Sequence, residues 1–217
     1  MLMPDVRALQ LIMELRRQGV TDSDVLSAIE TTPRDLFVPE IFRDRAYENN
    51  ALPIEAGQTI SQPYIVAFMT AVLNLTPKLR VFEVGTGSGY QTAILSKLAK
   101  RVFSMERHAP LMRTAEARFR KLGLLNVDTR VGDGAHGWIM QAPFDRIVVT
   151  AAVRKNPPEA LLNQLSVKGL MVIPIDRGGD GQVLVRVKRT SQGFQSTDLL
   201  PVRFVPLLEG VASENGA

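Results

Sequence analysis

The chain has 217 residues, 45% of them hydrophobic and 22% charged, which is the composition of a globular protein and excludes a disordered or fibrous one. Its 26 basic and 22 acidic residues leave a net charge of +4 that no long run of like charges concentrates, so we expect no nucleic-acid partner. Cysteine is absent and histidine occurs twice, which excludes disulfides and a thiol nucleophile and argues against a metal site, so we expect no metal.

The start of the chain carries no targeting signal that we can identify. Residues 1–7 lack the charged and then apolar order of a signal peptide. No apolar run approaches the roughly 18 residues that a membrane-spanning helix needs. We therefore expect a cytoplasmic protein without a membrane partner, and we expect it to be a monomer.

Two short helices are predicted near the N-terminus. Apolar residues at helical spacing indicate a first helix over residues 5–18, and Gly19 suits its C-terminal end. Thr21 is the predicted N-cap of a second helix, which buries the apolar residues between Val25 and Ile29. Such an N-terminal addition can form a lid over a substrate or cover one end of a sheet.

The stretch over residues 57–64, Gly-Gln-Thr-Ile-Ser-Gln-Pro-Tyr, leads into a further predicted helix whose first turn suits the proline. Ser61 either caps this helix or belongs to a loop whose hydroxyl and N–H groups face a substrate. In the second interpretation Gln58, Thr59 and Ile60 are substrate-binding residues of the same loop. A serine nucleophile is disfavoured because the G-x-S-x-G elbow is missing.

Residues 80–92, Arg-Val-Phe-Glu-Val-Gly-Thr-Gly-Ser-Gly-Tyr-Gln-Thr, are the centre of the predicted fold. A short apolar run precedes Gly85, Gly87 and Gly89, and an apolar-periodic segment follows, which indicates a strand, a tight turn and a helix. Glycines allow positive φ and let a ligand come close to the main chain. The N–H groups that open the helix favour an anionic group. We therefore predict that Gly85, Thr86 and Gly87 contact a nucleotide-like ligand.

The spacing of the glycines favours S-adenosylmethionine over NAD. The dinucleotide pattern G-x-G-x-x-G needs a glycine where this chain has Tyr90. Here the pattern is G-x-G-x-G, and Glu83 stands two positions before its first glycine. S-adenosylmethionine has no phosphates but carries an ammonium, a carboxylate, a ribose diol and a sulfonium, and we expect Glu83 to bind its amino acid end. A nucleotide-fold dehydrogenase is the alternative that Tyr90 disfavours.

Two more acidic residues follow the next strands. Glu106 stands at the end of the predicted strand 102–105, about 20 residues after the glycine turn, where a carboxylate can bind ribose hydroxyls. Asp133 lies between glycines just beyond the predicted strand 127–131, and with Gly134 it is expected to meet the adenine. Either acid alone could be a helix cap or a solvated charge. Their order at successive strand ends favours a cofactor site.

The remaining chain continues the α/β pattern. Strands are predicted at residues 145–149 and 169–175, with residues 161–165 part of a helix between them. Residues 183–187 and 202–205 are expected to form an antiparallel end of the sheet.

Together these segments resemble one known family. Gly-Gln-Thr-Ile-Ser-Gln-Pro-Tyr, Val-Gly-Thr-Gly-Ser-Gly-Tyr-Gln-Thr-Ala-Ile-Leu, Gly-Asp-Gly, Ala-Pro-Phe-Asp-Arg-Ile-Val-Val-Thr-Ala-Ala and Arg-Phe-Val-Pro-Leu are similar to stretches of the bacterial protein-L-isoaspartate (D-aspartate) O-methyltransferases. The resemblance runs in the same order over about residues 7–208. It implies a class I methyltransferase (Rossmann-like) fold, S-adenosylmethionine as donor, S-adenosylhomocysteine as product, and Ser61 as the match to the family's active-site serine.

The resemblance also implies a reaction. It is methylation of the free α-carboxylate of isoaspartyl residues in aged proteins and peptides, which starts repair through a succinimide. One alternative is a methyltransferase of the same fold that acts on RNA or a small acid. Another is a non-catalytic protein that binds isoaspartyl residues.

We expect one domain with a doubly wound, mostly parallel sheet and an antiparallel C-terminal edge. Residues 1–76 form N-terminal helices and an arm on the substrate side. Residues 77–208 form the core that binds S-adenosylmethionine. Residues 209–217 are small and polar, which predicts a disordered tail.

Overall fold

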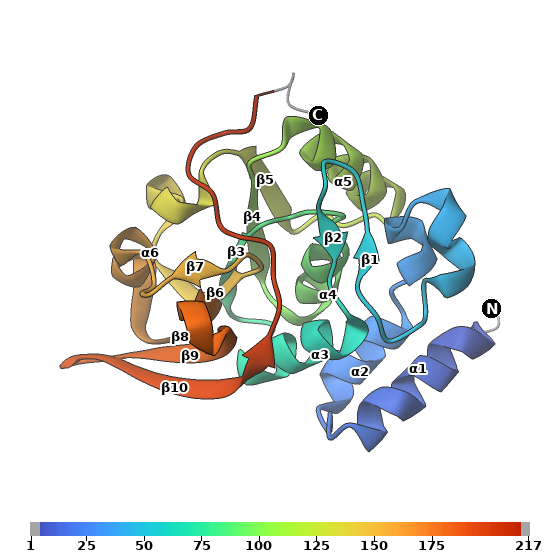
Figure 1. Cartoon of the computed structure of the whole chain (residues 1–217), viewed down its shortest axis with the longest axis horizontal. Helices are drawn as coiled ribbons and strands as arrows, with labels where there is room; N and C mark the ends of the chain where they lie inside the picture. Colours follow the sequence, from blue (N-terminus) through green and yellow to red (C-terminus); the bar gives the residue numbers. More distant parts are fainter. Residues whose placement is uncertain (1–4, 214–217) are drawn as a thin grey trace.

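A mostly parallel β-sheet forms the centre of the protein (Figure 1). The computed structural model describes residues 5–213. The strands of the sheet are β3 (Arg80–Val84), β4 (Arg101–Glu106), β5 (Val127–Val131), β6 (Phe144–Val149), β7 (Val153–Arg154), β8 (Leu165–Asp176), β9 (Gln182–Thr190) and β10 (Gly193–Val202). Their order is β10-β9-β8-β6-β3-β4-β5, with β7 paired to β8. Strands β3 to β8 pair in parallel, whereas β9 and β10 are antiparallel, which confirms the predicted sheet.

The helices and a small hairpin surround this sheet. The helices are α1 (Val6–Arg17), α2 (Ser23–Glu30), α3 (Pro63–Val72), α4 (Tyr90–Leu98), α5 (Ala109–Lys121) and α6 (Glu159–Gln164). Short 3-10 turns are η1 (Arg34–Phe37), η2 (Glu40–Arg45), η3 (Gly134–His136), η4 (Ile139–Gln141) and η5 (Gly178–Asp180). A separate hairpin joins β1 (Leu52–Pro53) to β2 (Thr59–Ile60).

Both faces of the central strand β3 are buried, which explains its nearly continuous apolar run. Val81 packs on one side in a cluster that includes Leu95 of α4. Its neighbour Phe82 points the other way, into a cluster with Phe144 of β6 and Leu161 of α6. A parallel strand with helices on both faces has no solvent-facing side, so both sets of alternating residues must be apolar.

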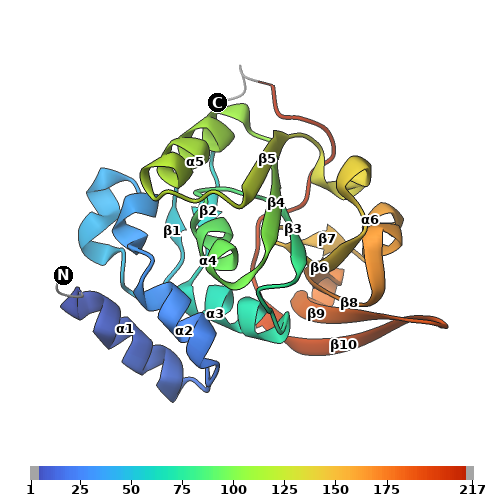
Figure 2. The same ribbon diagram turned by 180° about the vertical axis from the view of Figure 1, so that it is seen from behind.

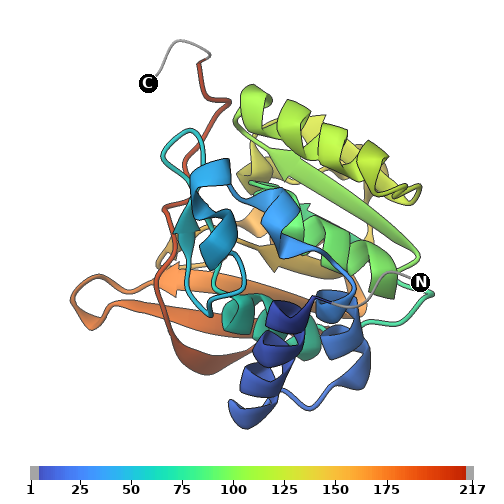
Figure 3. The same cartoon turned by 90° about the vertical axis from the view of Figure 1, so that its right-hand side faces the viewer.

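The N-terminal elements form a layer beside α3 and α4. Figures 2 and 3 show α1 and α2 together at one end of the molecule, away from the β9–β10 hairpin. Apolar residues of α1, α2 and η1 share one core cluster with α4, among them Leu15, Val25, Phe37 and Ile94. Residues 5–76 therefore pack onto the core through a continuous apolar interface.

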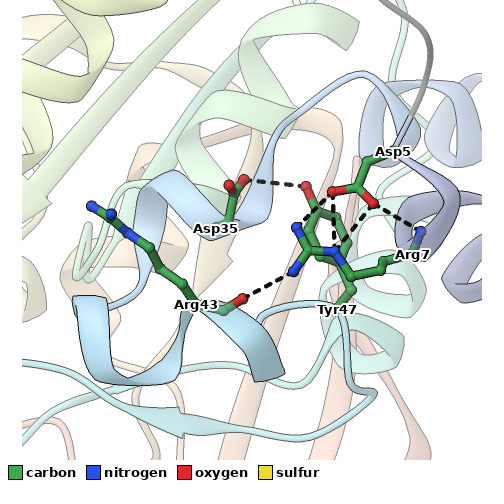
Figure 4. Close-up of polar contacts among 5 residues, drawn as sticks. All are labelled: Asp5, Arg7, Asp35, Arg43 and Tyr47. Atoms are coloured by element: carbon green, nitrogen blue, oxygen red, sulfur yellow. Dashed lines mark hydrogen bonds and ion pairs between the residues drawn. The ribbon is translucent and has the colours of Figure 1, made fainter.

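A polar cluster joins the start of α1 to the arm that follows α2 (Figure 4). Asp5 caps α1 by accepting from the Arg7 N–H at 2.9 Å and also pairs with the Arg7 guanidinium at 2.7 Å. That guanidinium lies 4.9 Å from the Tyr47 ring centroid and donates to the Arg43 carbonyl. The Tyr47 hydroxyl donates to Asp35 at 3.2 Å. These contacts fix residues 35 and 47 of the arm relative to α1.

Two predicted details of helix boundaries are wrong. The N-cap of α2 is Asp22 and not Thr21, because the Asp22 carboxylate accepts from the Asp24 and Val25 N–H groups at 3.0 and 3.1 Å. The helix predicted through residues 161–165 ends at Gln164, and Leu165 already begins β8.

The last strand and the tail also differ from the prediction. The strand expected at residues 202–205 is β10, which ends at Val202 because its partner β9 begins opposite it at Gln182. Its earlier part, exposed on both faces, carries no apolar periodicity to detect. Beyond Val202 the chain crosses the front of the sheet in Figure 1, and it passes behind the sheet in Figure 2.

Part of the expected disordered tail is held in place. The N–H of Gly210 donates to Asp133 at 2.7 Å, and that of Ala212 donates to the Arg107 carbonyl at 3.0 Å. Arg107 in turn donates to the Gly210 carbonyl at 3.2 Å. The prediction therefore does not describe residues 210–212, and residues 214–217 lie outside the described residues.

The stacked aromatic residues at the centre of the sheet give a stability prediction. Phe144 is fully buried, with its ring centroid 4.8 Å from that of Phe82 and 5.5 Å from that of Phe103. We expect Phe144→Ala to lower the free energy of unfolding by about 3–5 kcal/mol, because it leaves a cavity that the sheet cannot close. Urea denaturation measures this.

The matched control for that variant is Phe194→Ala on β10, where the side chain is 42% exposed. A change within about 0.5 kcal/mol is expected there. Equal losses for the two variants would show that the Phe82–Phe144 stack is not the core contact described above.

Candidate active site

A pocket of about 730 Å³ opens at the carboxyl ends of the central strands. Most of its wall comes from four segments of the chain: the hairpin and loop at residues 58–62, the turn at 84–91, residues 105–108 after β4, and residues 201–208. Strand β3 lies between β4 and β6, so the chain order of the sheet reverses beside it. This is where ligands bind in doubly wound folds.

The glycine turn after β3 is confirmed as a turn that only glycines can make. Gly85, Gly87 and Gly89 have φ values of +94°, +53° and +89°. A Cβ on Gly85 would lie 2.3 Å from the Thr150 hydroxyl oxygen, and one on Gly89 would lie 2.7 Å from the Phe119 ring. A Cβ on Gly87 would meet its nearest atom, from Ile54, at 3.8 Å. Packing thus requires Gly85 and Gly89, whereas at Gly87 the positive φ and not the available space favours glycine.

Glu106 lies beside this turn, as the sequence predicted. Its carboxylate accepts from the Gly87 N–H at 2.9 Å and from the His108 N–H at 3.0 Å. Only 5% of the residue is exposed, and it lines the pocket together with Thr86 and Gly87. The carboxylate that was predicted to bind a ribose is therefore held rigidly on the wall of the pocket.

Glu83, which was predicted to bind the amino acid end of the cofactor, does not line the pocket. It is fully buried and is not part of the pocket wall, because β3 directs its side chain under α4. Its Oε2 accepts from Thr92 of α4 and from Ser104 of β4, the latter at 2.5 Å. Ser104 is bonded at 2.6 Å to the hydroxyl of Thr86, which lines the pocket. Glu83 therefore holds the glycine turn in place indirectly, through the hydrogen bonds that join it to Ser104 and Ser104 to Thr86.

Burial makes the Glu83 carboxyl group a weaker acid than an exposed glutamate. It raises the pKa of this carboxyl group to about 7, although the hydrogen bonds from Ser104 and Thr92 act in the opposite direction. Oε1 is buried and has no hydrogen-bond partner among residues 5–213. A proton on the carboxyl group removes the cost of burying a charge there.

Asp133 is also placed differently from the prediction. Its carboxylate accepts from the N–H groups of Ala135 and Gly210, at 2.9 and 2.7 Å, and lies 3.1 Å from Nδ1 of His136. Burial acts to raise the pKa of Asp133, but the two N–H groups and His136 lower it below its usual value. Gly134 lines the pocket and Asp133 does not. The carboxylate thus fastens the C-terminal segment beside the predicted adenine site.

The structure decides between the two interpretations of Ser61. The N-cap of α3 is Gln62, and Pro63 occupies the first turn as predicted. Within residues 5–213 the Ser61 hydroxyl has no hydrogen-bond partner, and it lines the pocket. Ser61 is therefore a pocket residue and not a helix cap.

The other residues of this loop lie on the same wall. Gln58, Thr59 and Ile60 all line the pocket. Strand pairing of Leu52 with Ile60 fixes the end of the hairpin directly before Ser61. The structure thus brings the predicted substrate residues and the glycine turn into one cavity.

Sequence reasoning missed a buried arginine and the C-terminal segment. Arg34 donates to the Ser61 carbonyl at 2.8 Å. It begins η1, a short 3-10 turn in a segment without apolar periodicity. Residues 201–208 cross the mouth of the pocket, where the N–H of Ala152 donates to Val205 and that of Leu207 donates to Ala152. The prolines of this segment could have indicated an extended strap in place of a strand.

No group of three or more His, Asp or Glu side chains in residues 5–213 is arranged to hold a metal ion. No helix within that range is long and apolar enough to cross a membrane.

Comparisons with known proteins give one consistent result. A family model described as "Protein-L-isoaspartate(D-aspartate) O-methyltransferase (PCMT)" matches residues 6–212. A protein-L-isoaspartate O-methyltransferase of Paramagnetospirillum magneticum is 55% identical over 209 residues, which are 96% of this chain and 97% of that protein. One from Maricaulis maris is 54% identical over 212 residues, 98% of this chain and 99% of that protein.

Solved structures agree in fold. One named protein-L-isoaspartate O-methyltransferase has a TM-score of 0.84 at 27% identity, over 92% of this chain and 65% of that one. A candidate protein-L-isoaspartate O-methyltransferase of Plasmodium falciparum, solved with S-adenosyl-L-homocysteine, has a TM-score of 0.80 at 26% identity, over 92% and 97% of the chains. The fold is therefore that of the class I methyltransferases, as the sequence predicted.

The raised pKa of Glu83 predicts how stability depends on pH. The folded protein keeps its proton up to about pH 7, whereas the unfolded chain releases it near the ordinary glutamate value. The folded state thus binds more protons in this interval, so this group's contribution to stability is full at lower pH and is lost as pH rises to about 7. We expect Glu83→Gln, which cannot titrate, to remove this part of the pH dependence. Denaturant unfolding at several pH values between 5 and 8 measures it, and identical pH profiles of the two proteins would contradict it.

Proposed function

The chain belongs to the protein-L-isoaspartate(D-aspartate) O-methyltransferase family, and from this premise we propose that it methylates the free α-carboxylate of isoaspartyl residues in damaged proteins and peptides. The methyl donor is S-adenosylmethionine and the product is S-adenosylhomocysteine. The methyl ester then closes to a succinimide, which water opens partly to normal aspartate. The observation that carries the proposal is the unengaged Ser61 hydroxyl in the same pocket as the glycine turn.

The pocket fits the donor in size and chemistry. Its volume of about 730 Å³ is in the range of small-molecule sites. We assign the ribose to Glu106, and the rest of the cofactor contacts to Gly85, Thr86, Gly87 and Gly134, which line the pocket. Glu83 and Asp133 do not line the pocket, but their hydrogen bonds hold the segments of its wall in place. When bound, the donor supplies a methyl group made electrophilic by a positive sulfonium.

The substrate needs no general base from the protein. A peptide α-carboxylate is ionised at pH 7, so it is already the nucleophile. One carboxylate oxygen forms the bond to the methyl carbon while the carbon–sulfur bond breaks and its electron pair stays on sulfur. No proton is transferred. The protein's residues therefore have to align the carboxylate and keep water away.

Ser61 and its loop suit this task. The Ser61 hydroxyl can donate to one carboxylate oxygen, and its N–H and that of Gln62 donate no hydrogen bond within residues 5–213. The apolar side chains of Ile60, Val66 and Leu207 line the same pocket and lower its polarity. Opposite charges cancel in this reaction, so a poorly solvated site that holds the reactants in line favours it over bulk water.

Several further properties are part of the proposal. We assign residues 1–76 to the substrate side and residues 77–208 to the cofactor-binding core. The reaction needs no metal, and the protein works as a monomer in the cytoplasm without nucleic acid. The diffuse net charge of +4 supports the last point.

Two synthetic peptides that differ only in one isoaspartate or aspartate test the proposed reaction. With labelled S-adenosylmethionine we expect label on the isoaspartyl peptide alone, and we expect its loss at neutral pH as the ester closes. Label on neither peptide, with the cofactor still bound, would contradict the proposal and point to another acceptor.

Ser61→Ala tests the role of the hydroxyl. We expect turnover to fall by roughly 10- to 100-fold, the effect of one hydrogen bond to a charged group, with the affinity for S-adenosylhomocysteine unchanged. Steady-state kinetics and calorimetry measure the two quantities. Equal losses in both would assign Ser61 to the cofactor instead. Ser27→Ala on the exposed side of α2 is the control and should change neither.

A further inference from the structure

Arg34 is a fully buried cation, and no carboxylate among residues 5–213 forms an ion pair with it. Its relative exposure is 0%. Nε donates to the Ala46 carbonyl at 2.8 Å, and one terminal nitrogen donates to the Ser61 carbonyl at 2.8 Å. Its guanidinium carbon lies 4.6 Å from the centroid of the Tyr90 ring. All of these partners are uncharged.

The carboxylate next to Arg34 in the sequence has another partner. Asp35 accepts from the Tyr47 hydroxyl in the polar cluster of Figure 4, and no ion pair to Arg34 is formed within residues 5–213. Burial lowers the pKa of the Arg34 guanidinium, but arginine remains protonated in proteins. A buried charge without a counter-charge is costly, so its presence calls for an explanation.

The position of Arg34 explains why a charge is buried there. Its two principal contacts on the pocket side are Ser61, in the substrate loop, and Tyr90, the first residue of α4 after the glycine turn. Both residues line the pocket, whereas Arg34 does not. The guanidinium thus lies outside the pocket, in contact with both the substrate loop and the first residue after the cofactor turn. A negative charge in the pocket at Ser61 would be close to it in a poorly solvated region.

We propose that Arg34 is a positioning residue whose charge attracts the substrate carboxylate to Ser61 through the intervening loop, without touching it. This inference rests on the proposed function. The bond to the Ser61 carbonyl also fixes the loop's backbone, so that its hydroxyl and N–H groups face the pocket.

The indirect arrangement suits the chemistry. A guanidinium in direct contact would form a strong bidentate pair with the carboxylate and reduce its nucleophilicity. From behind the loop, the same charge binds the anion and leaves its oxygens available. The methyl ester is neutral, so the attraction ends with the reaction and favours release of the product.

Peptide binding without turnover tests the proposal. Affinities are measured by calorimetry, with S-adenosylhomocysteine present, for an isoaspartyl peptide and for the same peptide with an α-carboxamide in place of the α-carboxylate. The wild-type protein should bind the carboxylate peptide about tenfold or more tightly than the amide, a factor that corresponds to about 1.4 kcal/mol. Arg34→Met should lose this preference by weakening the carboxylate peptide alone.

Controls separate charge from structure. Tyr47→Phe removes the neighbouring hydrogen bond to Asp35 and keeps the charge, so it should keep the preference even if stability falls. Arg34→Lys also keeps a positive charge and should retain a preference, and it replaces Arg34→Met if that variant does not fold.

Three outcomes would overturn the inference. They are equal binding of the two peptides by the wild-type protein, an undiminished preference in Arg34→Met, and equal binding by folded Arg34→Lys. Labelled methyl transfer by the wild-type protein, run in parallel, keeps this question apart from the proposed function: methylation of the isoaspartyl peptide without a carboxylate preference in binding rejects the role of Arg34 alone.

Discussion

The hydrogen bonds of the buried Glu83 carboxyl group hold the site together. From β3 this group accepts from Thr92 of α4 and Ser104 of β4, and Ser104 is bonded to Thr86 in the glycine turn. One group thus joins two strands, the following helix and the turn between them. A further hydrogen bond, from the Gly87 N–H to the Glu106 carboxylate, also restricts the backbone of the turn. A rigid cofactor wall is the consequence.

The substrate side depends on a second buried polar residue. Arg34 connects the Ala46 and Ser61 carbonyls and stacks against Tyr90, so the arm, the substrate loop and α4 meet at one side chain. The two halves of the site therefore rest on two buried polar groups, a carboxyl group and a guanidinium, that both lie outside the pocket. The wall that the reactants meet at Ser61 carries a neutral hydroxyl, which suits a reaction in which a carboxylate must remain nucleophilic.

Local sequence patterns predicted much of this arrangement. The strand, the glycine turn and the position of Glu106 follow from backbone rules and from the geometry of parallel sheets. The structure has each of them where the sequence predicted it. That Glu83 and Asp133 lie outside the pocket wall could not be predicted, because sequence position places an acid at a strand end but does not show which way its side chain points. Arg34 gave no signal, since its partners are carbonyls distant in sequence. The path of residues 203–212 was missed because its contacts with Ala152 and Asp133 are tertiary.

The central claim is that the methyl acceptor is a carboxylate held at Ser61 opposite the cofactor turn. A crystal structure of the protein with S-adenosylhomocysteine and an isoaspartyl peptide tests it most directly. We predict the α-carboxylate within hydrogen-bond distance of the Ser61 hydroxyl, with the sulfur of the cofactor in line with one of its oxygens and Arg34 behind the loop. A carboxylate bound instead by Arg107 or Arg203, which also line the pocket, would contradict the account.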